Sequence, residues 1–200
     1  IAGAINSSLS YPRVVETLGH RGPDEQNGYR HNNVDLFHVR LSILDITRGQ
    51  QPMHMAEKFT IIFNGEIYNH QEIRKQYNLK GNTTSDTETL LLLYERFETD
   101  FLHLLDGMFA FVIYDKIKNH LFIARDRAGK KPFYYFFDYK TFLFASELNC
   151  LKTMTNVEIE TTGFFQYLRL GTFYRQFTPY KNVTELRAGS FLVVDCSTLS

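Results

Sequence analysis

The stretch MFAFVIYDKIKNHLFIARDRAGKKPFYYFFDYKTFLFASE, residues 108–147, decides the fold class. It contains four apolar, aromatic-rich runs, at 108–115, 120–126, 131–138 and 141–147, which are separated by short polar turns. Aromatic residues favour strands, and short links between neighbouring strands favour antiparallel pairing. The stretch therefore predicts an antiparallel meander of four strands.

Further strands are predicted on either side of this meander. Residues 34–46 alternate apolar with polar side chains, a pattern typical of a half-buried strand. Apolar runs also predict strands over 58–68 and 185–195. These strands are numerous enough for two antiparallel sheets.

Helices are predicted from apolar periodicity and from capping residues. Their ranges are 11–19, which breaks at Gly19; 69–78, which Asn69 can cap; 85–105, where Ser85 and Glu88 form a capping box; and 161–171, which ends at Gly171. Helices that cover two antiparallel sheets make an α+β layered domain. The 200 residues are enough for one sizeable core, so we expect a single domain over residues 1–200.

The composition excludes several classes of function. Lys and Arg total 22, as do Asp and Glu, so no basic excess points to nucleic acid or to an anionic membrane. The apolar runs are too short to span a bilayer, and the sequence opens with no signal peptide. Two cysteines, Cys150 and Cys196, are too few for a disulfide framework and suit a reducing cytosol. The seven histidines lack the spacing of a metal site, so we expect a cytoplasmic protein without a bound metal.

The segment FNGEIYNH, residues 63–70, places polar residues directly after a buried strand. Asn64, Gly65 and Glu66 are consecutive, and a solvent turn at the end of the strand would explain them. An oxyanion hole would also explain them, because Asn offers a side-chain N–H and Gly lets its backbone N–H approach a ligand closely. The residues alone leave both interpretations open.

Charged residues raise the same question at other predicted element ends. Arg40 lies inside a predicted strand, where it either forms a salt bridge or aims its guanidinium at a ligand carboxylate. Asp86 begins the main helix, where it either stabilises the helix dipole or, with Glu66, accepts from a ligand ammonium. Together with Asn64, these groups could hold an α-amino acid by its carboxylate, its amine and its side-chain carbonyl.

Several motifs follow one another along the chain: HRGPD (20–24), RLSILD (40–45), QPM (51–53), FNGEIYN (63–69), SDTE (85–88), GMFAFVIYD (107–115) and RDRAGKKPFYY (125–135). In sequence and order they resemble the class II glutaminase domain of glutamine-hydrolysing asparagine synthetases. The resemblance covers essentially the whole chain. It implies the N-terminal-nucleophile hydrolase fold, a four-layer αββα sandwich with two antiparallel sheets.

The resemblance also implies roles for individual residues. In the family, an N-terminal Cys thiolate attacks the side-chain amide carbon of glutamine, and its own α-amino group serves as the base. By motif, Asn64 and Gly65 would form the oxyanion hole. Arg40 would bind the α-carboxylate of glutamine, and Glu66 and Asp86 would bind its α-ammonium.

The chain departs from the family at its first residue. The family begins Met-Cys-Gly-Ile and loses the Met, whereas this sequence begins with Ile1. The nucleophilic Cys is therefore expected just before Ile1, near the loop of Arg21, to which the resemblance gives a supporting role. Cys150 and Cys196 lie deep in the chain and cannot supply a free α-amine. Residues 1–200 by themselves are expected to be inactive.

The family also carries a C-terminal synthetase domain with a Ser-Gly-Gly-x-Asp-Ser loop that binds ATP, and this loop does not occur in residues 1–200. The resemblance therefore implies a parent enzyme that uses ATP and Mg²⁺ to amidate aspartate with ammonia from glutamine. The glutaminase domain would need no cofactor of its own. Its partners would be glutamine and the synthetase domain of the same polypeptide, and a homodimer stays open.

Two alternatives remain. Glucosamine-phosphate synthases and phosphoribosylpyrophosphate amidotransferases share the nucleophile fold, and some relatives within the asparagine synthetase branch amidate sugars or secondary metabolites. The stretches RLSILD and NGEIYNH are closer to the asparagine synthetase branch, but the acceptor binds outside the glutaminase domain. Without a nucleophile, the domain would instead be a glutamine-binding module that senses the amino acid.

Overall fold

The computed structural model describes residues 1–41, 49–174 and 176–200. Its strands are β1 (Ala2–Ile5), β2 (Glu25–His31), β3 (Val34–Arg40), β4 (Met53–Met55), β5 (Phe59–Ile67), β6 (Gly107–Asp115), β7 (His120–Arg125), β8 (Tyr134–Phe137), β9 (Phe142–Ala145), β10 (Val183–Glu185) and β11 (Phe191–Asp195). Its helices are α1 (Tyr11–Leu18), α2 (His70–Gln76), α3 (Asp86–Phe97), α4 (Leu148–Met154) and α5 (Thr161–Leu170), with 3₁₀ turns at Gly19–Arg21 and Asp100–Leu104.

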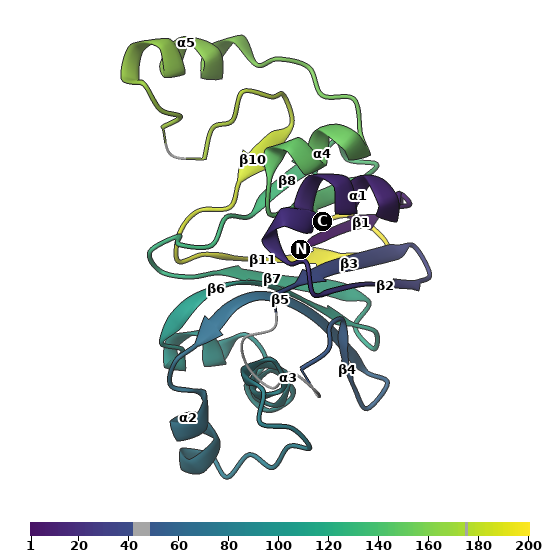
Figure 1. Cartoon of the computed structure of the whole chain (residues 1–200), viewed down its shortest axis with the longest axis vertical. Helices are drawn as coiled ribbons and strands as arrows, with labels where there is room; N and C mark the ends of the chain where they lie inside the picture. The colour runs from purple at the N-terminus through teal and green to yellow at the C-terminus, as the bar shows by residue number, and fades with distance from the viewer. Residues whose placement is uncertain (42–48, 175) are drawn as a thin grey trace.

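Two antiparallel sheets lie face to face between layers of helices (Figure 1). The six-stranded sheet has the order β10-β8-β9-β1-β3-β2, and the five-stranded sheet has the order β11-β7-β6-β5-β4. Helices α1 and α4 cover the first sheet, while α2 and α3 lie below the second (Figure 1). The predicted α+β architecture with two antiparallel sheets is therefore confirmed.

The predicted four-stranded meander is wrong at its middle link. Strands β6 and β7 pair in one sheet, and β8 and β9 pair in the other. The connection between β7 and β8 crosses from sheet to sheet because it folds around Asp126, whose carboxylate accepts from the N–H groups of Ala128, Lys130 and Lys131. A short polar link between two strands therefore marks a sheet change here, which strand propensity does not reveal.

Two other predicted strands need correction. The strand expected over 34–46 ends at Arg40 in the described part of the chain, and residues 42–48 lie outside the described residues. It is buried on both faces rather than half-buried, since the second sheet covers one face and α1 covers the other. The strand expected over 185–195 is present but shorter, as β11 from Phe191 to Asp195, and Glu185 instead ends β10 in the other sheet.

Two helix predictions also differ from the structure. The helix expected over 85–105 ends at Phe97, because Glu98 has a positive φ of 51° that stops the α-helix before the 3₁₀ turn. Asn69 does not cap α2. Its side-chain amide instead donates to the Leu104 carbonyl at 2.9 Å and accepts from the Asp106 N–H at 3.0 Å. The sequence analysis did not predict β1, β2, β4 or α4.

The capping box expected at the start of α3 is half right. The Ser85 hydroxyl accepts from the Thr87 N–H at 3.1 Å, as a helix cap should. Glu88 does not reach back to Ser85. Its carboxylate accepts from the N–H groups of Asn82 and Thr83 and so fixes the loop before the helix.

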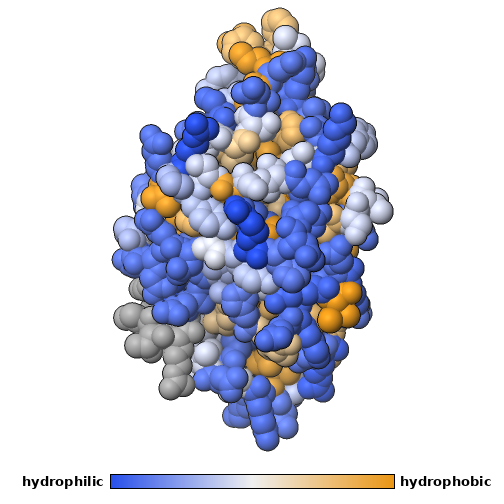
Figure 2. Space-filling model, turned by 90° about the vertical axis from the view of Figure 1, so that its right-hand side faces the viewer, coloured by the Kyte–Doolittle hydropathy of each residue, from blue (hydrophilic) through white to orange (hydrophobic). Residues whose placement is uncertain are grey.

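Helix α5 stands at one end of the molecule, away from the sandwich (Figure 1). Apolar side chains gather at the same end in the space-filling view (Figure 2). The helix ends at Gly171, whose left-handed φ of 72° suits glycine, so the end predicted from the sequence is confirmed. No helix among the described residues is long and apolar enough to cross a membrane.

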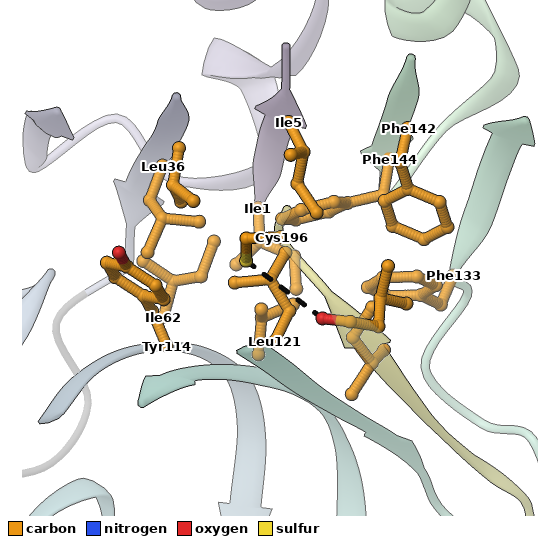
Figure 3. Close-up of a cluster of buried hydrophobic side chains, with 14 of the residues drawn as sticks. Ile1, Ile5, Leu36, Ile62, Tyr114, Leu121, Phe133, Phe142, Phe144 and Cys196 are labelled. Atoms are coloured by element: carbon orange, nitrogen blue, oxygen red, sulfur yellow. Dashed lines mark hydrogen bonds between the residues drawn. The ribbon is translucent and has the colours of Figure 1, made fainter. Parts of the chain in front are cut away.

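The main core fills the space between the two sheets (Figure 3). Ile5 and Leu36 project into it from the six-stranded sheet, and Ile62 and Leu121 project from the five-stranded sheet. Close packing of these layers fixes the distance between the sheets. Because β3 and β5 lie in different sheets, the core also fixes where their polar ends stand relative to one another.

Candidate active site

A cavity of about 330 Å³ lies where the end of β3, the second half of β5 and the start of α3 meet. Every candidate residue of the sequence analysis lines it: Arg21, Arg40, Asn64, Gly65, Glu66 and Asp86. Other lining residues include His38, Gln51, Met108 and Lys131. Its volume is at the small end of the range for ligand pockets.

Asn64, Gly65 and Glu66 do not form a turn, because β5 continues through them to Ile67. They pair with Ala110, Phe109 and Met108 of β6 in an unbroken register. Gly65 has a φ of 152°, and a Cβ there would lie only 2.1 Å from the Met108 carbonyl oxygen. The position therefore requires glycine.

The outer edge of β5 presents backbone N–H groups to the cavity. In an antiparallel ladder the N–H groups of alternate residues point away from the partner strand, here those of Phe63, Gly65 and Ile67. Gln51 Oε1 accepts from Phe63 N at 2.6 Å, and Asp86 Oδ2 accepts from Ile67 N at 3.0 Å. Gly65 lies between these two satisfied positions, so its N–H is directed at the cavity.

The side chain of Asn64 lines the same cavity and makes no hydrogen bond to the described part of the chain. A side-chain N–H and a backbone N–H from consecutive residues thus stand at one wall. Two N–H donors arranged in this way can stabilise a developing oxyanion.

Arg40 is at the end of β3, with its side chain only 5% exposed. Its Nη1 pairs with Glu25 Oε1 at 2.8 Å, and its backbone carbonyl accepts from the Asp24 N–H at 3.0 Å. The HRGPD loop lies against the same strand, because a Cβ at Gly22 would be 2.5 Å from the Val39 carbonyl group. The salt bridge expected as one alternative for Arg40 is therefore present, and the residue also lines the cavity.

Arg21 enters the cavity from the HRGPD loop. Its Nη1 contacts Glu147 Oε1 at 2.9 Å, and His20 Nε2 contacts the same oxygen at 3.0 Å. Glu147 thus ties the loop to the segment between β9 and α4. The arrangement gives Arg21 a fixed position at the cavity wall, near Ile1.

Asp86 and Glu66 supply the negative charge of the cavity. Asp86 is 4% exposed, and burial raises the pKa of its carboxyl above the ordinary value, although the Ile67 N–H and the nearby His70 act in the opposite direction. An ammonium group beside these two residues would favour the ionised carboxylates. Arg40 therefore provides a cationic part of the cavity, and Asp86 with Glu66 provides an anionic part.

The sequence analysis gave no role to Gln51 or His38, although QPM was among the quoted motifs. Gln51 Nε2 donates to the Phe63 carbonyl at 3.1 Å, and His38 Nε2 contacts the same oxygen at 3.0 Å. Because a carbonyl oxygen only accepts, His38 carries its proton on Nε2. Burial lowers the pKa of His38 to about 3, so the ring is neutral. Its Nδ1 is then an acceptor without a partner among the described residues.

Lys131 is a further cavity residue that was not identified from the sequence. Its N–H donates to Asp126 Oδ2 at 3.0 Å, and its carbonyl accepts from Arg125 Nε at 2.7 Å. Arg125 is held in turn by Glu185, 2.8 Å away. The motif RDRAGKKPFYY therefore acts as a compact loop that brings a lysine to the cavity.

The two cysteines stand apart from the cavity wall. Both thiols are free and buried; burial raises the pKa of Cys150 and raises that of Cys196 to about 12. Neither offers a thiolate near neutral pH. Within residues 1–41, 49–174 and 176–200, no three His, Cys, Asp or Glu side chains gather in a way that could hold a metal ion.

Known proteins are similar in sequence to this chain over most of its length. A family model described as a glutamine amidotransferase domain matches residues 1–200. Asparagine synthetase [glutamine-hydrolyzing] 3 of Bacillus subtilis is 38% identical over 192 residues, which cover 92% of this chain and 31% of that protein. A putative asparagine synthetase [glutamine-hydrolyzing] 2 of Methanocaldococcus jannaschii is 35% identical and covers 92% of this chain and 40% of that protein. Asparagine synthetase B of Escherichia coli is 43% identical over 138 residues, or 67% of this chain and 25% of that protein. The chain therefore spans well under half the length of these relatives.

Solved structures agree on the fold. Glutamine phosphoribosylpyrophosphate amidotransferase from B. subtilis superposes with a TM-score of 0.68 at 17% identity, covering 97% of this chain and 46% of that chain. An allosteric regulatory enzyme of purine biosynthesis superposes with a TM-score of 0.67 at 18% identity. The amidotransferase sandwich expected from the sequence is thus confirmed. The chain belongs to the glutamine amidotransferase family, as a domain homologous to the glutaminase domains of asparagine synthetases.

Proposed function

We propose that the cavity binds glutamine and that this domain, in its active form, hydrolyses it to glutamate and ammonia. One observation carries the proposal: cationic side chains, a pair of carboxylates and two N–H donors line a single small cavity. Arg40 is suited to the α-carboxylate, and Glu66 with Asp86 to the α-ammonium. The Asn64 amide and the Gly65 N–H are then left for the side-chain carbonyl.

The reaction that fits these groups is acyl transfer to a thiolate. The sulfur of an N-terminal Cys attacks the amide carbon, and the carbonyl oxygen becomes an oxyanion that accepts from Asn64 and Gly65. The intermediate collapses, and ammonia leaves with a proton from the α-amino group of the Cys. Water then hydrolyses the γ-glutamyl thioester to release glutamate and restore the thiol.

The surroundings of Ile1 support a nucleophile that precedes it. The Ile1 nitrogen donates to Ser146 Oγ at 3.0 Å at the entrance to β1. This nitrogen lies close enough to His38 and Arg21 to interact electrostatically with both side chains. Both His38 and Arg21 are cavity residues, and a Cys-Gly pair before Ile1 would extend up to about 7 Å from it. Such a pair would bring the sulfur to the cavity.

Glutamate release from residues 1–200 tests this assignment. We expect no turnover from residues 1–200 alone, because the buried thiols of Cys150 and Cys196 are protonated near neutral pH. The same chain preceded by Cys-Gly should hydrolyse glutamine, and a version preceded by Ser-Gly serves as the matched control. Sustained turnover by residues 1–200 alone would contradict the mechanism. Glutamine binding without turnover in all three would favour a glutamine-binding module.

The parent protein is proposed to be a cytoplasmic asparagine synthetase. Its synthetase portion, outside residues 1–200, would use ATP and Mg²⁺ to activate aspartate, and this domain would need no cofactor of its own. The proposal is supported by asparagine synthetases from three organisms that are 35%, 38% and 43% identical to this chain. The acceptor cannot be read from the glutaminase cavity, so an acceptor of the sugar or secondary-metabolite type is the alternative.

The acceptor is tested on the full-length polypeptide. Supplied with glutamine, aspartate and Mg-ATP, it should form asparagine and glutamate, and ammonium salts should replace glutamine. Glutamine hydrolysis without any asparagine would retain the glutaminase assignment and favour another acceptor. Both products are quantified in the same reaction.

A further inference from the structure

Helix α5 carries apolar side chains that the domain does not bury. Of its ten residues, only Gly163 is buried. Phe165 and Leu168 are 68% and 64% exposed, and Leu170 is 55% exposed. A surface helix ordinarily turns its apolar stripe toward its own core. Here the large side chains are turned outward instead.

The outward side chains form one surface, which we call the α5 face: Phe164, Phe165, Tyr167 and Leu168. Spacings of three and four residues place them on neighbouring turns of the helix. The chain that returns from the helix adds Tyr174 and Phe177, which are 52% and 41% exposed. The end of the molecule that α5 occupies is correspondingly rich in apolar side chains (Figure 2).

The side of α5 opposite the α5 face contacts the returning chain and holds the helix in place. A Cβ at Gly163 would lie 2.5 Å from the Thr178 carbonyl oxygen, so the helix backbone contacts the returning chain directly. Glu160 N donates to the Pro179 carbonyl at 2.8 Å, and Ile159 forms a β-bridge with Tyr180. These contacts leave the side chains of Phe165 and Leu168 largely exposed. An exposed apolar surface of this kind usually marks an interaction site.

We propose that the α5 face docks against the synthetase portion of the same polypeptide, an inference that rests on the proposed function. The relatives support this occupant, since the region that matches this chain covers only 31%, 40% and 25% of their lengths. A protein in which the glutaminase domain is the smaller part must accommodate a large second portion beside that domain. An apolar face is suited to a permanent contact, because obligate interfaces are more hydrophobic than transient ones.

The size of the α5 face argues against a second copy of the domain as its occupant. A ten-residue helix is about 15 Å long and 10–12 Å across. Its outer side therefore offers far less than the roughly 800 Å² that each partner contributes to a standard interface. A portion tethered in the same chain needs less area, because its effective concentration reaches roughly the millimolar range.

Docking at α5 would hold the source of ammonia beside the portion that consumes it. If the contact is lost, the two reactions continue separately, and ammonia escapes into solution. The expected sign is an increase in glutamate formed per asparagine formed, while each partial reaction retains its rate. A higher ratio with unchanged partial reactions indicates a docking surface, whereas replacing exposed residues without a docking role would leave the ratio unchanged.

Hydroxyl-radical footprinting of the full-length polypeptide tests the contact directly. Corrected for intrinsic reactivity, Phe165 and Leu168 should react about fivefold more slowly than Tyr139 and Ile117, because docking removes them from water. Tyr139 and Ile117 are 85% and 75% exposed and serve as controls. Protection should persist on dilution. Equal reactivity at all four positions, or protection that disappears on dilution together with a dimer, would overturn the proposal.

The double variant Phe165→Ser with Leu168→Ser provides the functional test in the full-length polypeptide. Glutamate formed per asparagine should rise several-fold, while glutamine hydrolysis and ammonia-dependent synthesis stay within about twofold of the parent. Ile117→Ser with Tyr139→Ser should leave the ratio unchanged. An unchanged ratio in the α5 variant would overturn the inference. A parent polypeptide without glutaminase activity would instead contradict the proposed function, and the footprint is independent of activity.

Discussion

Gln51 holds the backbone of Phe63 through both ends of its side-chain amide. Its Oε1 accepts from the Phe63 N–H at 2.6 Å, and its Nε2 donates to the Phe63 carbonyl at 3.1 Å. Strand β4 pairs with β5 only as far as Ile61, so beyond that point the Gln51 side chain takes the place of a neighbouring strand. Phe63 immediately precedes Asn64, so this contact sets the position of both proposed oxyanion donors.

Replacing Gln51 tests whether this contact positions the cavity. Gln51→Met keeps the length of the side chain and removes both hydrogen bonds. We expect kcat for glutaminase to fall about 10- to 100-fold, since a displacement of about 1 Å at a reacting group can cost about 10²-fold. The KM for glutamine should change much less, because Arg40, Glu66 and Asp86 remain. Steady-state glutamate release from the full-length protein gives both constants.

Thr178→Val is the matched control for Gln51→Met. The Thr178 hydroxyl is also buried, donates to the Val183 carbonyl at 2.8 Å and accepts from the Tyr180 N–H at 3.2 Å, but it does not line the cavity. Both variants should lower the melting temperature. Only the Gln51 variant should lose kcat per folded molecule, and equal behaviour of the two would mean that Gln51 serves stability alone.

The Asp126 loop predicts a pH-dependent stability. Burial opposes ionisation of Asp126, but N–H groups of Lys131, Lys130, Phe109 and Ala128 outweigh it and lower the pKa of the carboxyl below 3.8. A lowered carboxyl pKa contributes stability that is present above about pH 4 and is lost as the pH falls through the folded-state value. Asp126→Asn should therefore destabilise the protein by about 1.5–3 kcal/mol at pH 7.

The difference between the parent and Asp126→Asn should shrink as the pH falls below about 4, because the unfolded parent is protonated first and the folded carboxylate only at a lower pH. Urea unfolding at several pH values measures it. Asp138→Asn is the control, since Asp138 accepts from Lys140 and Thr141 in a turn of the same type. Its effect should stay below about 1 kcal/mol because the turn is exposed. A pH-independent loss in Asp126→Asn would exclude the ionised carboxylate as the cause.

The fold class followed from strand runs and capping residues, whereas the connection between the sheets did not. Propensity depends on neighbours within a few residues, so it identified β6, β7, β8 and β9 and the start of α3. Whether β8 pairs with β7 depends on Asp126 and on contacts with Glu185, which is distant in sequence. Strand β2 was missed because its polar residues remain partly exposed at the sheet edge.

The candidate site was predicted mainly from residue chemistry at element ends and from the family resemblance. These identified Arg40, Asn64 and Asp86, which all line the cavity. They did not identify Gln51 or His38, because both act on a backbone carbonyl, which a sequence does not display. The turn suggested as the simple explanation of Asn64 and Gly65 was excluded only by their pairing with β6.

Arg40 should control affinity for glutamine. Arg40→Ala in the full-length protein should raise the KM for glutamine, since a charge-assisted hydrogen bond contributes about 1.5–3 kcal/mol, which corresponds to about 10- to 100-fold. Ammonia-dependent synthesis should be nearly unaffected because it bypasses the cavity. Arg30→Ala is the control: it removes an ion pair with Asp35 in the same β2–β3 strand pair, outside the cavity. An unchanged KM would assign Arg40 a structural role, to which its bond to Glu25 contributes.

Asn64 provides the most direct test of the chemistry. If its side-chain N–H donates to the oxyanion, the contact strengthens as the carbonyl carbon becomes tetrahedral. Removing the amide therefore raises the free energy of the transition state more than that of the bound substrate. Asn64→Ala should lower kcat by about 10²–10³-fold with a much smaller change in KM. Glutaminase kinetics of the full-length variant, normalised to folded protein, measure this.

Asn69→Ala separates catalysis from stability in the same segment. The Asn69 amide makes two backbone hydrogen bonds, to Leu104 and Asp106, and does not line the cavity. Its loss should cost about 1–3 kcal/mol of stability and leave kcat unchanged. Asn64 should behave in the opposite way, because its amide makes no hydrogen bond to the described residues and so contributes little to folding. A normal kcat with a lowered melting temperature in Asn64→Ala would show that the amide supports β5 and does not stabilise an oxyanion.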